Sequence, residues 1–159
     1  MKPLDAIDIA ILEALQADGR MAVSVLARLV GLSGTACTER VRSLEADGVI
    51  TGYTAVLSGD AIGLGLLAFI EISLDRISRD SFDQFRDAVA AIPEIEECHM
   101  VAGGFDYLLK VRVPDMSAYR RFLGDALASV PGIRQTHSYP VMEEIRSGPR
   151  LSLGHVARI

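Results

Sequence analysis

Two nine-residue segments of this chain are near-copies of each other, and their spacing constrains the fold more than any other feature. DAVAAIPEI spans residues 87–95, and DALASVPGI follows 38 residues later, at 125–133. Each copy predicts the end of a helix, then a proline that stops it, then an isoleucine that opens a strand. An apolar strand precedes each copy, LLAFIEISL at 66–74 and YLLKVRV at 107–113. The predicted order, β-α-β followed by β-α-β, is typical of a ferredoxin-like domain.

A ferredoxin-like sheet carries both of its helices on one face and leaves the other face open. An uncovered apolar sheet on a domain of this size normally associates with a second copy. We therefore expect residues 66–145 to fold as a ferredoxin-like βαββαβ domain that forms a homodimer.

The first 48 residues have a different pattern, that of short helices joined by tight turns. Apolar residues recur at helical spacing over residues 4–15, and a second short helix is predicted at about 23–30. After Gly31, the hydroxyl of Ser33 is placed to cap a third helix, which Gly48 closes. Two helices joined by a tight glycine-containing turn, with the second one capped, indicate a helix-turn-helix.

The predicted third helix has two distinct faces. The apolar face, expected to pack on the first two helices, holds Cys37, Val41 and Leu44. The opposite face is polar, with Arg40 on a flank, and it holds Thr35, Thr38, Glu39 and Arg42. Such a face suits a helix in the major groove of DNA, where arginines bind phosphates or guanine. A solvated face of a small helical bundle has the same pattern, so periodicity alone leaves both interpretations open.

A linker separates the two predicted domains. Residues 49–57 are rich in β-forming types and predict a strand, and the glycine-rich segment 58–65 predicts a hinge. We thus expect a helix-turn-helix domain at 1–48 and a strand and hinge linker at 49–65. The ferredoxin-like domain follows at 66–145, and a C-terminal tail at 146–159 has no assigned role.

Composition limits the partners of the chain. Half of the 159 residues are apolar, and the N-terminus carries acids where a signal peptide would be basic. No run approaches the ~20 apolar residues that span a membrane, so we expect a cytoplasmic protein with no membrane partner. The net charge is −5, and the first 60 residues hold 5 basic and 8 acidic side chains. Because a protein that coats nucleic acid would be strongly basic, any DNA binding must rely on a few placed arginines.

Several residue pairs resemble catalytic or metal sites but lack the geometry of either. Cys98 and His99 are neighbours on a predicted strand, as are Glu96 and Glu97, and neighbours on a strand point to opposite faces. The histidines have no ligand partners at metal spacing. GGFD lacks the G-x-G-x-x-G of a dinucleotide site. We predict no catalytic residue, no metal site and no cofactor, and hence no enzyme.

Longer stretches resemble a known family. They are LDAIDIAILEALQADGR, LARLVGLS, TERVRSLEADGVITGYTA, EIEECHMVAGGFDYLLKVRVPDMSAY and YPVMEE. Over about residues 4–146 the chain resembles the Lrp/AsnC (leucine-responsive regulatory protein) family of bacterial transcription regulators. The resemblance implies an α+β protein: an N-terminal winged helix-turn-helix domain, a hinge, and a C-terminal ferredoxin-like domain that senses an amino acid. It also implies dimers through the sheets, assembled into octamers or similar rings.

The recognition helix of that family corresponds to residues 34–44. The resemblance assigns contact with double-stranded DNA to Ser33, Thr35, Thr38, Glu39, Arg40 and Arg42. Relatives commonly have prolines near the start of this helix, where this chain has Gly34 and Ala36. A missing proline loosens the first turn, which leaves the preferred operator open.

The effector loop of the family corresponds to HMVAGGFDYLL, residues 99–109. The resemblance implies that a small amino acid, bound between dimers, contacts Met100, Ala102, Gly103, Gly104, Phe105, Asp106, Tyr107 and Tyr139. Such a ligand needs acceptors for its ammonium, N–H groups for its carboxylate and a pocket for its side chain. Asp106 either contacts the ligand or braces the loop by accepting hydrogen bonds from backbone N–H groups. Both roles stay open.

Many relatives have an acidic residue where this chain has Gly104. Without that acid a basic effector lacks a partner, so we expect leucine, methionine, a branched-chain relative or proline. The sequence predicts a DNA-binding regulator of amino-acid metabolism, modulated by a small, neutral, apolar amino acid at an interface between dimers. The alternative is a small-molecule-binding module whose helix-turn-helix serves assembly and not DNA binding.

Overall fold

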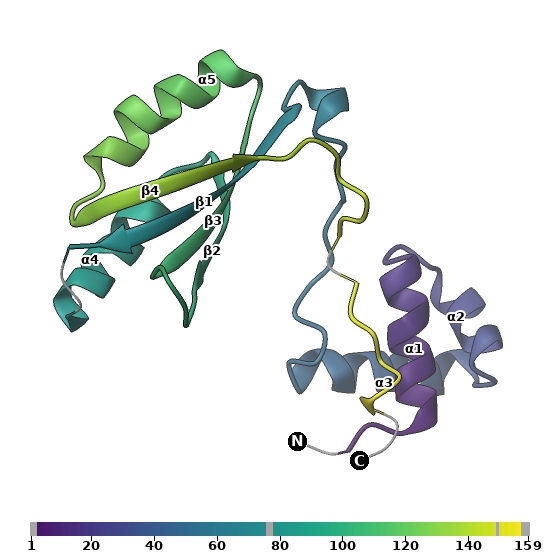
Figure 1. Ribbon diagram of the computed structural model, residues 1–159. Helices are drawn as coiled ribbons and strands as arrows, with labels where there is room; N and C mark the ends of the chain where they lie inside the picture. The colour runs from purple at the N-terminus through teal and green to yellow at the C-terminus, as the bar shows by residue number, and fades with distance from the viewer. Residues whose placement is uncertain (1–2, 76–77, 149, 157–159) are drawn as a thin grey trace. The chain divides into compact units, whose positions relative to one another are not determined.

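The chain folds into two compact units. The computed structural model describes residues 3–75, 78–148 and 150–156 (Figure 1). The helical unit joins Met1–Val56 to the C-terminal segment Ser147–Ile159, and the sheet unit spans Leu57–Arg146. The C-terminal tail, to which the sequence assigns no role, groups with the helical unit.

Three helices build the helical unit, α1 (Ala6–Ala17), α2 (Val23–Leu29) and α3 (Gly34–Ala46). The helix-turn-helix prediction is confirmed, and so is the cap: the Ser33 hydroxyl oxygen accepts a hydrogen bond from the Ala36 N–H at 3.2 Å. Asp5 caps α1 in the same way, as part of a reciprocal capping box with Asp8. Gly31 and Gly48 both have φ of +70°, a conformation that glycine adopts without strain.

The helices of this unit enclose a small apolar core. It is made of Ile11, Leu12, Ala14, Leu26, Ala27, Cys37 and Leu44, with Val41 packed at its margin. The predicted inward face of α3 is thus confirmed, since Cys37 is fully buried and Leu44 nearly so. The polar face of α3 points away from this core.

The C-terminal tail packs on this helical core. Leu153 is half-buried against it. The side-chain amide of Gln16 on α1 makes two bonds to the backbone of Leu151: its Nε2 donates to the carbonyl at 3.3 Å, and its Oε1 accepts from the N–H at 2.7 Å. Two backbone groups of the tail are therefore satisfied by one side chain.

The predicted strand at 49–57 is wrong for the isolated chain. Residues 51–57 are not assigned to a helix or a strand, and within the described residues no ladder joins them to another segment. The wing expected beside the helix-turn-helix is therefore absent from the described part of the helical unit. Strand-forming residue types are not sufficient, because a strand needs a neighbour for its N–H and carbonyl groups.

The sheet unit has the predicted βαββαβ order. Its elements are β1 (Leu66–Leu74), α4 (Arg79–Ala90), β2 (Ile95–Met100), β3 (Tyr107–Val113), α5 (Met116–Arg121) and β4 (Ile133–Pro140). After α5 the chain continues through a wider π turn at Phe122–Ala126 and a 3-10 turn at Leu127–Ser129. The strands are antiparallel in the order β2-β3-β1-β4. Both repeat copies behave as predicted, since Ile95 opens β2 and Ile133 opens β4.

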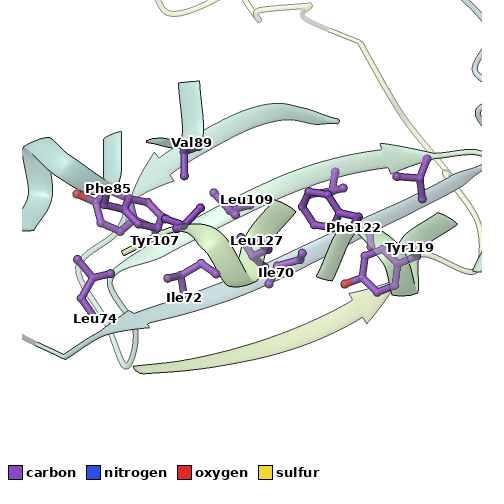
Figure 2. Close-up of a cluster of buried hydrophobic side chains, with 14 residues drawn as sticks. Ile70, Ile72, Leu74, Phe85, Val89, Tyr107, Leu109, Tyr119, Phe122 and Leu127 are labelled. Carbon is purple, nitrogen blue, oxygen red and sulfur yellow. The ribbon is translucent and has the colours of Figure 1, made fainter. Parts of the chain in front are cut away.

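Both helices pack on one face of this sheet. The side chains that meet there come from β1, β3, α4 and the helical segment after β3; Figure 2 labels Ile70, Ile72, Leu74, Phe85, Val89, Tyr107, Leu109, Tyr119, Phe122 and Leu127. Residues of β3 alternate between buried and half-buried, as expected of a strand covered on one side only. None of the helices in the described ranges is long and apolar enough to cross a membrane.

Candidate DNA-binding helix and effector loop

The exposed side of α3 brings together four of the predicted DNA-binding residues. Thr35, Glu39 and Arg42 are exposed, and Thr38 is half-buried. Arg42 Nη1 lies 3.1 Å from Glu39 Oε1, an ion pair along one helix. Exposed pairs of this kind contribute at most about 1 kcal/mol, so Arg42 can exchange Glu39 for a phosphate. The Thr38 hydroxyl donates to the Gly34 carbonyl at 2.8 Å and remains able to accept.

Arg40 is placed differently from the other predicted DNA-binding residues. Its Nη1 lies 2.6 Å from Asp5 Oδ2 and 2.7 Å from Asp8 Oδ1, both at the start of α1. These two carboxylates raise the pKa of Arg40 above its ordinary value, with the Asp5 hydrogen bond as the larger cause. The guanidinium therefore already has anionic partners within the protein.

The predicted effector loop is a hairpin between β2 and β3. Met100 of β2 faces Tyr107 of β3 in the ladder, and residues 101–106 form the turn. Ala102, Gly103 and Gly104 are exposed, and no heavy atom outside their immediate chain neighbours lies within 4 Å of a Cβ built on either glycine. The backbone around these two glycines is therefore open to close approach.

Asp106 braces this hairpin. Its Oδ2 accepts a hydrogen bond from the Leu74 N–H at 2.7 Å, and its own N–H donates to the Ile72 carbonyl at 2.8 Å. Its carbonyl accepts from the Val101 N–H at 3.0 Å. The start of β3 is therefore fastened both to the end of β1 and across the turn. The hydrogen bonds of the bracing role are thus present, and contact between Asp106 and a ligand stays a prediction.

Two aromatic residues of the predicted site lie apart from the loop surface. Tyr107 is buried, with its ring 4.4 Å from that of Phe85 in α4. Burial raises the pKa of Tyr107. Tyr139 is half exposed on β4 and pairs with Phe69, at the sheet edge opposite β2. Within the sheet unit, the loop and Tyr139 do not form one site.

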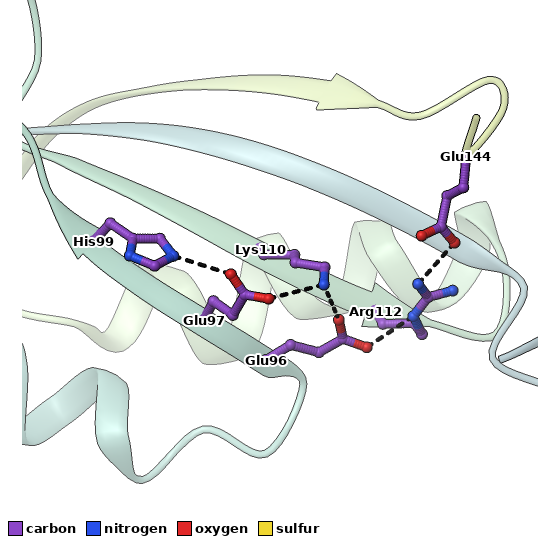
Figure 3. A network of polar contacts seen from close by, with 6 residues as sticks. All are labelled: Glu96, Glu97, His99, Lys110, Arg112 and Glu144. Carbon is purple, nitrogen blue, oxygen red and sulfur yellow. Dashed lines mark hydrogen bonds and ion pairs between the residues drawn. The ribbon is translucent and has the colours of Figure 1, made fainter. Parts of the chain in front are cut away.

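The open face of the sheet carries a network of charges rather than an apolar surface alone (Figure 3). Lys110 Nζ lies 2.9 Å from Glu97 Oε1 and 3.1 Å from Glu96 Oε2, and Arg112 joins Glu96 to Glu144 at 2.7 and 2.8 Å. His99 Nε2 lies 3.0 Å from Glu97. Lys110 is the main cause of the lowered pKa of Glu97, and His99 adds to it.

The sequence argument that Glu96 and Glu97 diverge is wrong. Both carboxylates reach Lys110, because the pairing of β2 with β3 shifts register between Ile95 and Glu97. A bulge of this kind turns two neighbouring side chains to one face. Their partners are cations, and among the described residues no cluster of three or more His, Cys, Asp or Glu could hold a metal ion.

Two structural features are not predicted by the sequence patterns. The first is the pairing of Arg40 with Asp5 and Asp8, for which the three-residue spacing of the two acids before an apolar run was an available signal. The second is the docking of the tail. Its alternation of Leu151 and Leu153 was the one available sign, and two residues are too few to predict a partner.

Both parts of the chain are similar to known proteins. Residues 4–45 match the model of the AsnC-type helix-turn-helix domain, and residues 67–151 match that of the Lrp/AsnC ligand binding domain. The leucine-responsive regulatory proteins of Klebsiella pneumoniae and Escherichia coli K12 are each 53% identical to this chain over 150 residues. That match covers 94% of this chain and 92% of each relative.

Solved structures are similar as well. A transcriptional regulator from Neisseria meningitidis, solved in complex with L-methionine, superposes with a TM-score of 0.92 at 37% identity, covering 96% of this chain and 99% of that one. An AsnC family regulator from Agrobacterium tumefaciens gives a TM-score of 0.91 at 36% identity, with the same shares covered.

Proposed function

The chain belongs to the Lrp/AsnC family of transcription regulators, and from this premise we infer how its two units divide the work. It is a DNA-binding transcription regulator modulated by an amino acid, and not an enzyme. The observation that carries this function is the 53% identity to leucine-responsive regulatory proteins over 94% of the chain. It acts in the cytoplasm of a bacterial cell, the compartment that holds the DNA.

The helical unit binds double-stranded DNA through α3. The capped start of this helix and its exposed Thr35 and Arg42 suit entry into the major groove. Because Arg42 is held only by an exposed pair with Glu39, a phosphate or a guanine edge can replace that partner. Ser33 acts through the cap that shapes the first turn.

The hairpin loop of the sheet unit binds the effector. Its exposed glycines let a ligand approach the backbone closely, and N–H groups there can hold an α-carboxylate. One carboxylate oxygen of Asp106 accepts a hydrogen bond from the Leu74 N–H, and residue 104 is a glycine and not an acid. The loop therefore lacks a second carboxylate that could pair with the side chain of a basic amino acid. The effector is a neutral, apolar amino acid such as leucine or methionine. The L-methionine complex of the Neisseria relative supports this class.

The open sheet face forms a homodimer, and dimers join into a larger ring. Half-buried Phe69 and Leu108 lie on this face beside the exposed Tyr139. An antiparallel sheet with one uncovered face, part apolar and part charged, suits an isologous contact with a second copy. Residues of a neighbouring dimer then complete the pocket for a ligand bound on the open loop. It acts by binding one assembly more tightly than another.

Two measurements test this function. Fluorescence anisotropy with the DNA upstream of its own gene should show salt-sensitive binding that an effector changes. Calorimetric titration with a panel of amino acids should give leucine or methionine the tightest binding. Absence of DNA binding with and without amino acids contradicts the first part, and tightest binding of lysine or arginine contradicts the second.

A further inference from the structure

Arg40 joins the recognition helix to the first turn of α1. Asp5 and Asp8 form the capping box of α1: the Asp5 carboxylate accepts from the N–H groups of Ile7 and Asp8, and Asp8 Oδ2 accepts from the Asp5 N–H. Arg40 Nη1 contacts both carboxylates at 2.6 and 2.7 Å. One guanidinium thus ties the middle of α3 to both acids of the cap.

Because Asp8 is buried, Arg40 cannot easily exchange its two acidic partners for a DNA phosphate. The Asp8 side chain is only 11% exposed, and that of Arg40 is 31% exposed. If Arg40 turned to a DNA phosphate, Asp8 would stay largely buried as an unpaired carboxylate, which is strongly unfavourable. The hydrogen bonds of Asp5 to backbone N–H groups and to Arg40 lower the pKa of Asp5, so this acid stays a charged partner of the arginine near neutral pH.

Arg42, two residues later, has the opposite environment. Its side chain is 69% exposed, and its partner Glu39 on the same helix is 66% exposed. Solvent screens such a pair, so its loss is nearly neutral. The two arginines of α3 therefore differ in what they can do on DNA, although the sequence makes both of them candidates for DNA contact.

We propose that Arg40 is a positioning residue that fixes the recognition helix against α1 through the capping box, while Arg42 carries the charge that meets DNA. The proposal rests on DNA binding by α3. It predicts that Asp8, an acid of α1 and not of the recognition helix, is needed for tight DNA binding.

The test compares five full-length variants: Arg40→Gln, Arg40→Lys, Asp8→Asn, Arg42→Gln and the double variant Arg40→Gln/Asp8→Asn. The probe is a labelled duplex that the wild-type protein selects from random-sequence DNA. Affinity is measured by anisotropy over a series of KCl concentrations, at a temperature at which circular dichroism shows every variant folded. Each protomer contact to a phosphate contributes about 0.9 to the slope of log affinity against log salt.

We expect Arg42→Gln to reduce this slope and both Arg40→Gln and Asp8→Asn to leave it unchanged. Arg40→Gln and Asp8→Asn should each lower affinity by roughly two- to thirtyfold, the range for residues that act on a site without touching the ligand. The double variant should lose no more than either single one, because both remove the same link. Arg40→Lys should recover part of the loss.

The sign of the Asp8→Asn effect separates the alternatives. If Arg40 contacted DNA, removing its acidic partner would release it and raise the affinity, and Arg40→Gln would reduce the slope as Arg42→Gln does. Either result overturns the inference while leaving DNA binding itself intact. Failure of the wild-type protein to enrich any duplex overturns the proposed function and this inference together.

Discussion

At the scale of single residues, Asp106 holds the geometry of the effector loop. It is half-buried, and its carboxylate and backbone together bind two other parts of the sheet unit: the end of β1, at Ile72 and Leu74, and the other side of the turn, at Val101. A carboxylate that accepts from a backbone N–H makes a charge-assisted hydrogen bond, stronger than a neutral one. The loop is therefore preorganised before any ligand arrives.

Replacing Asp106 tests this role. Asp106→Ala leaves the Leu74 N–H without its acceptor and should lower the free energy of unfolding by about 1–3 kcal/mol in urea denaturation. Asp106→Asn keeps an acceptor, so it should lose less than half as much and keep its effector affinity in calorimetry. A drop of more than about tenfold for Asp106→Asn would instead show that the charge holds the ligand. The matched control is Asp125→Asn, because Asp125 is an exposed carboxylate in the π turn Phe122–Ala126.

At the scale of elements, the C-terminal tail completes the helical unit. Leu153 reaches the apolar core, while the Leu151 side chain two residues earlier is 73% exposed. The two leucines of one short segment thus have opposite environments. We expect the tail to contribute to the stability of α1 and α3.

Leu153→Ala should destabilise the helical unit by roughly 1–2 kcal/mol, below the range for a fully buried leucine. Hydrogen exchange of the α1 and α3 amides should accelerate, and exchange in the sheet unit should not. Leu151→Ala is the control from the same segment and should change neither. Equal effects of the two substitutions would show that Leu153 does not dock.

The charged network between β2 and β3 gives the sheet unit an acid-side dependence on pH. Because Lys110 and His99 lower the pKa of Glu97 in the folded state, the charged form favours folding. This contribution is complete above the ordinary value of 4.5 and is lost as the pH falls through the lowered pKa of the folded protein.

Glu97→Gln removes that contribution. Urea denaturation from about pH 6 to about pH 3 should show the wild-type protein losing stability more steeply than Glu97→Gln. Glu143→Gln, at an exposed acid outside the network, should follow the wild-type curve. Parallel curves for Glu97→Gln and the wild type would mean that solvent screens the network fully.

At the scale of the whole molecule, the chain passes between its two units twice. The first passage is near residues 56–57 and the second near 146–147. A change in the sheet unit can therefore reach the helical unit through both the linker and the tail. The linker and the tail are thus the two covalent connections between the units.

Assembly is the property that the open sheet face should control. Leu108 of β3 lies on this face, opposite His99 of β2 and Glu71 of β1. Leu108→Asp places a carboxylate opposite Glu71 on this face and should dissociate the dimer, as measured by sedimentation or light scattering. Leu29→Asp, the same change at an exposed leucine of α2, should leave the oligomer intact. An unchanged mass for Leu108→Asp would place the dimer contact elsewhere.

The sequence by itself determined the order of elements and the candidate residues. The repeat placed Ile95 and Ile133 at strand starts, and the hydroxyl of Ser33 placed the cap of α3, because capping, proline stops and periodicity are local properties. Family resemblance added the effector loop. These features need no knowledge of which distant segments meet.

Only the tertiary structure decided what the polar residues contact. It paired Arg40 with α1, committed one oxygen of Asp106 to Leu74, turned Glu96 and Glu97 to the same side, and returned the tail to α1. Among the residues that the structure describes, it also gave 51–57 no strand partner. Each outcome depends on groups far apart in the chain, and the partner of a charge or of a backbone N–H is set by proximity in space, which local patterns do not encode.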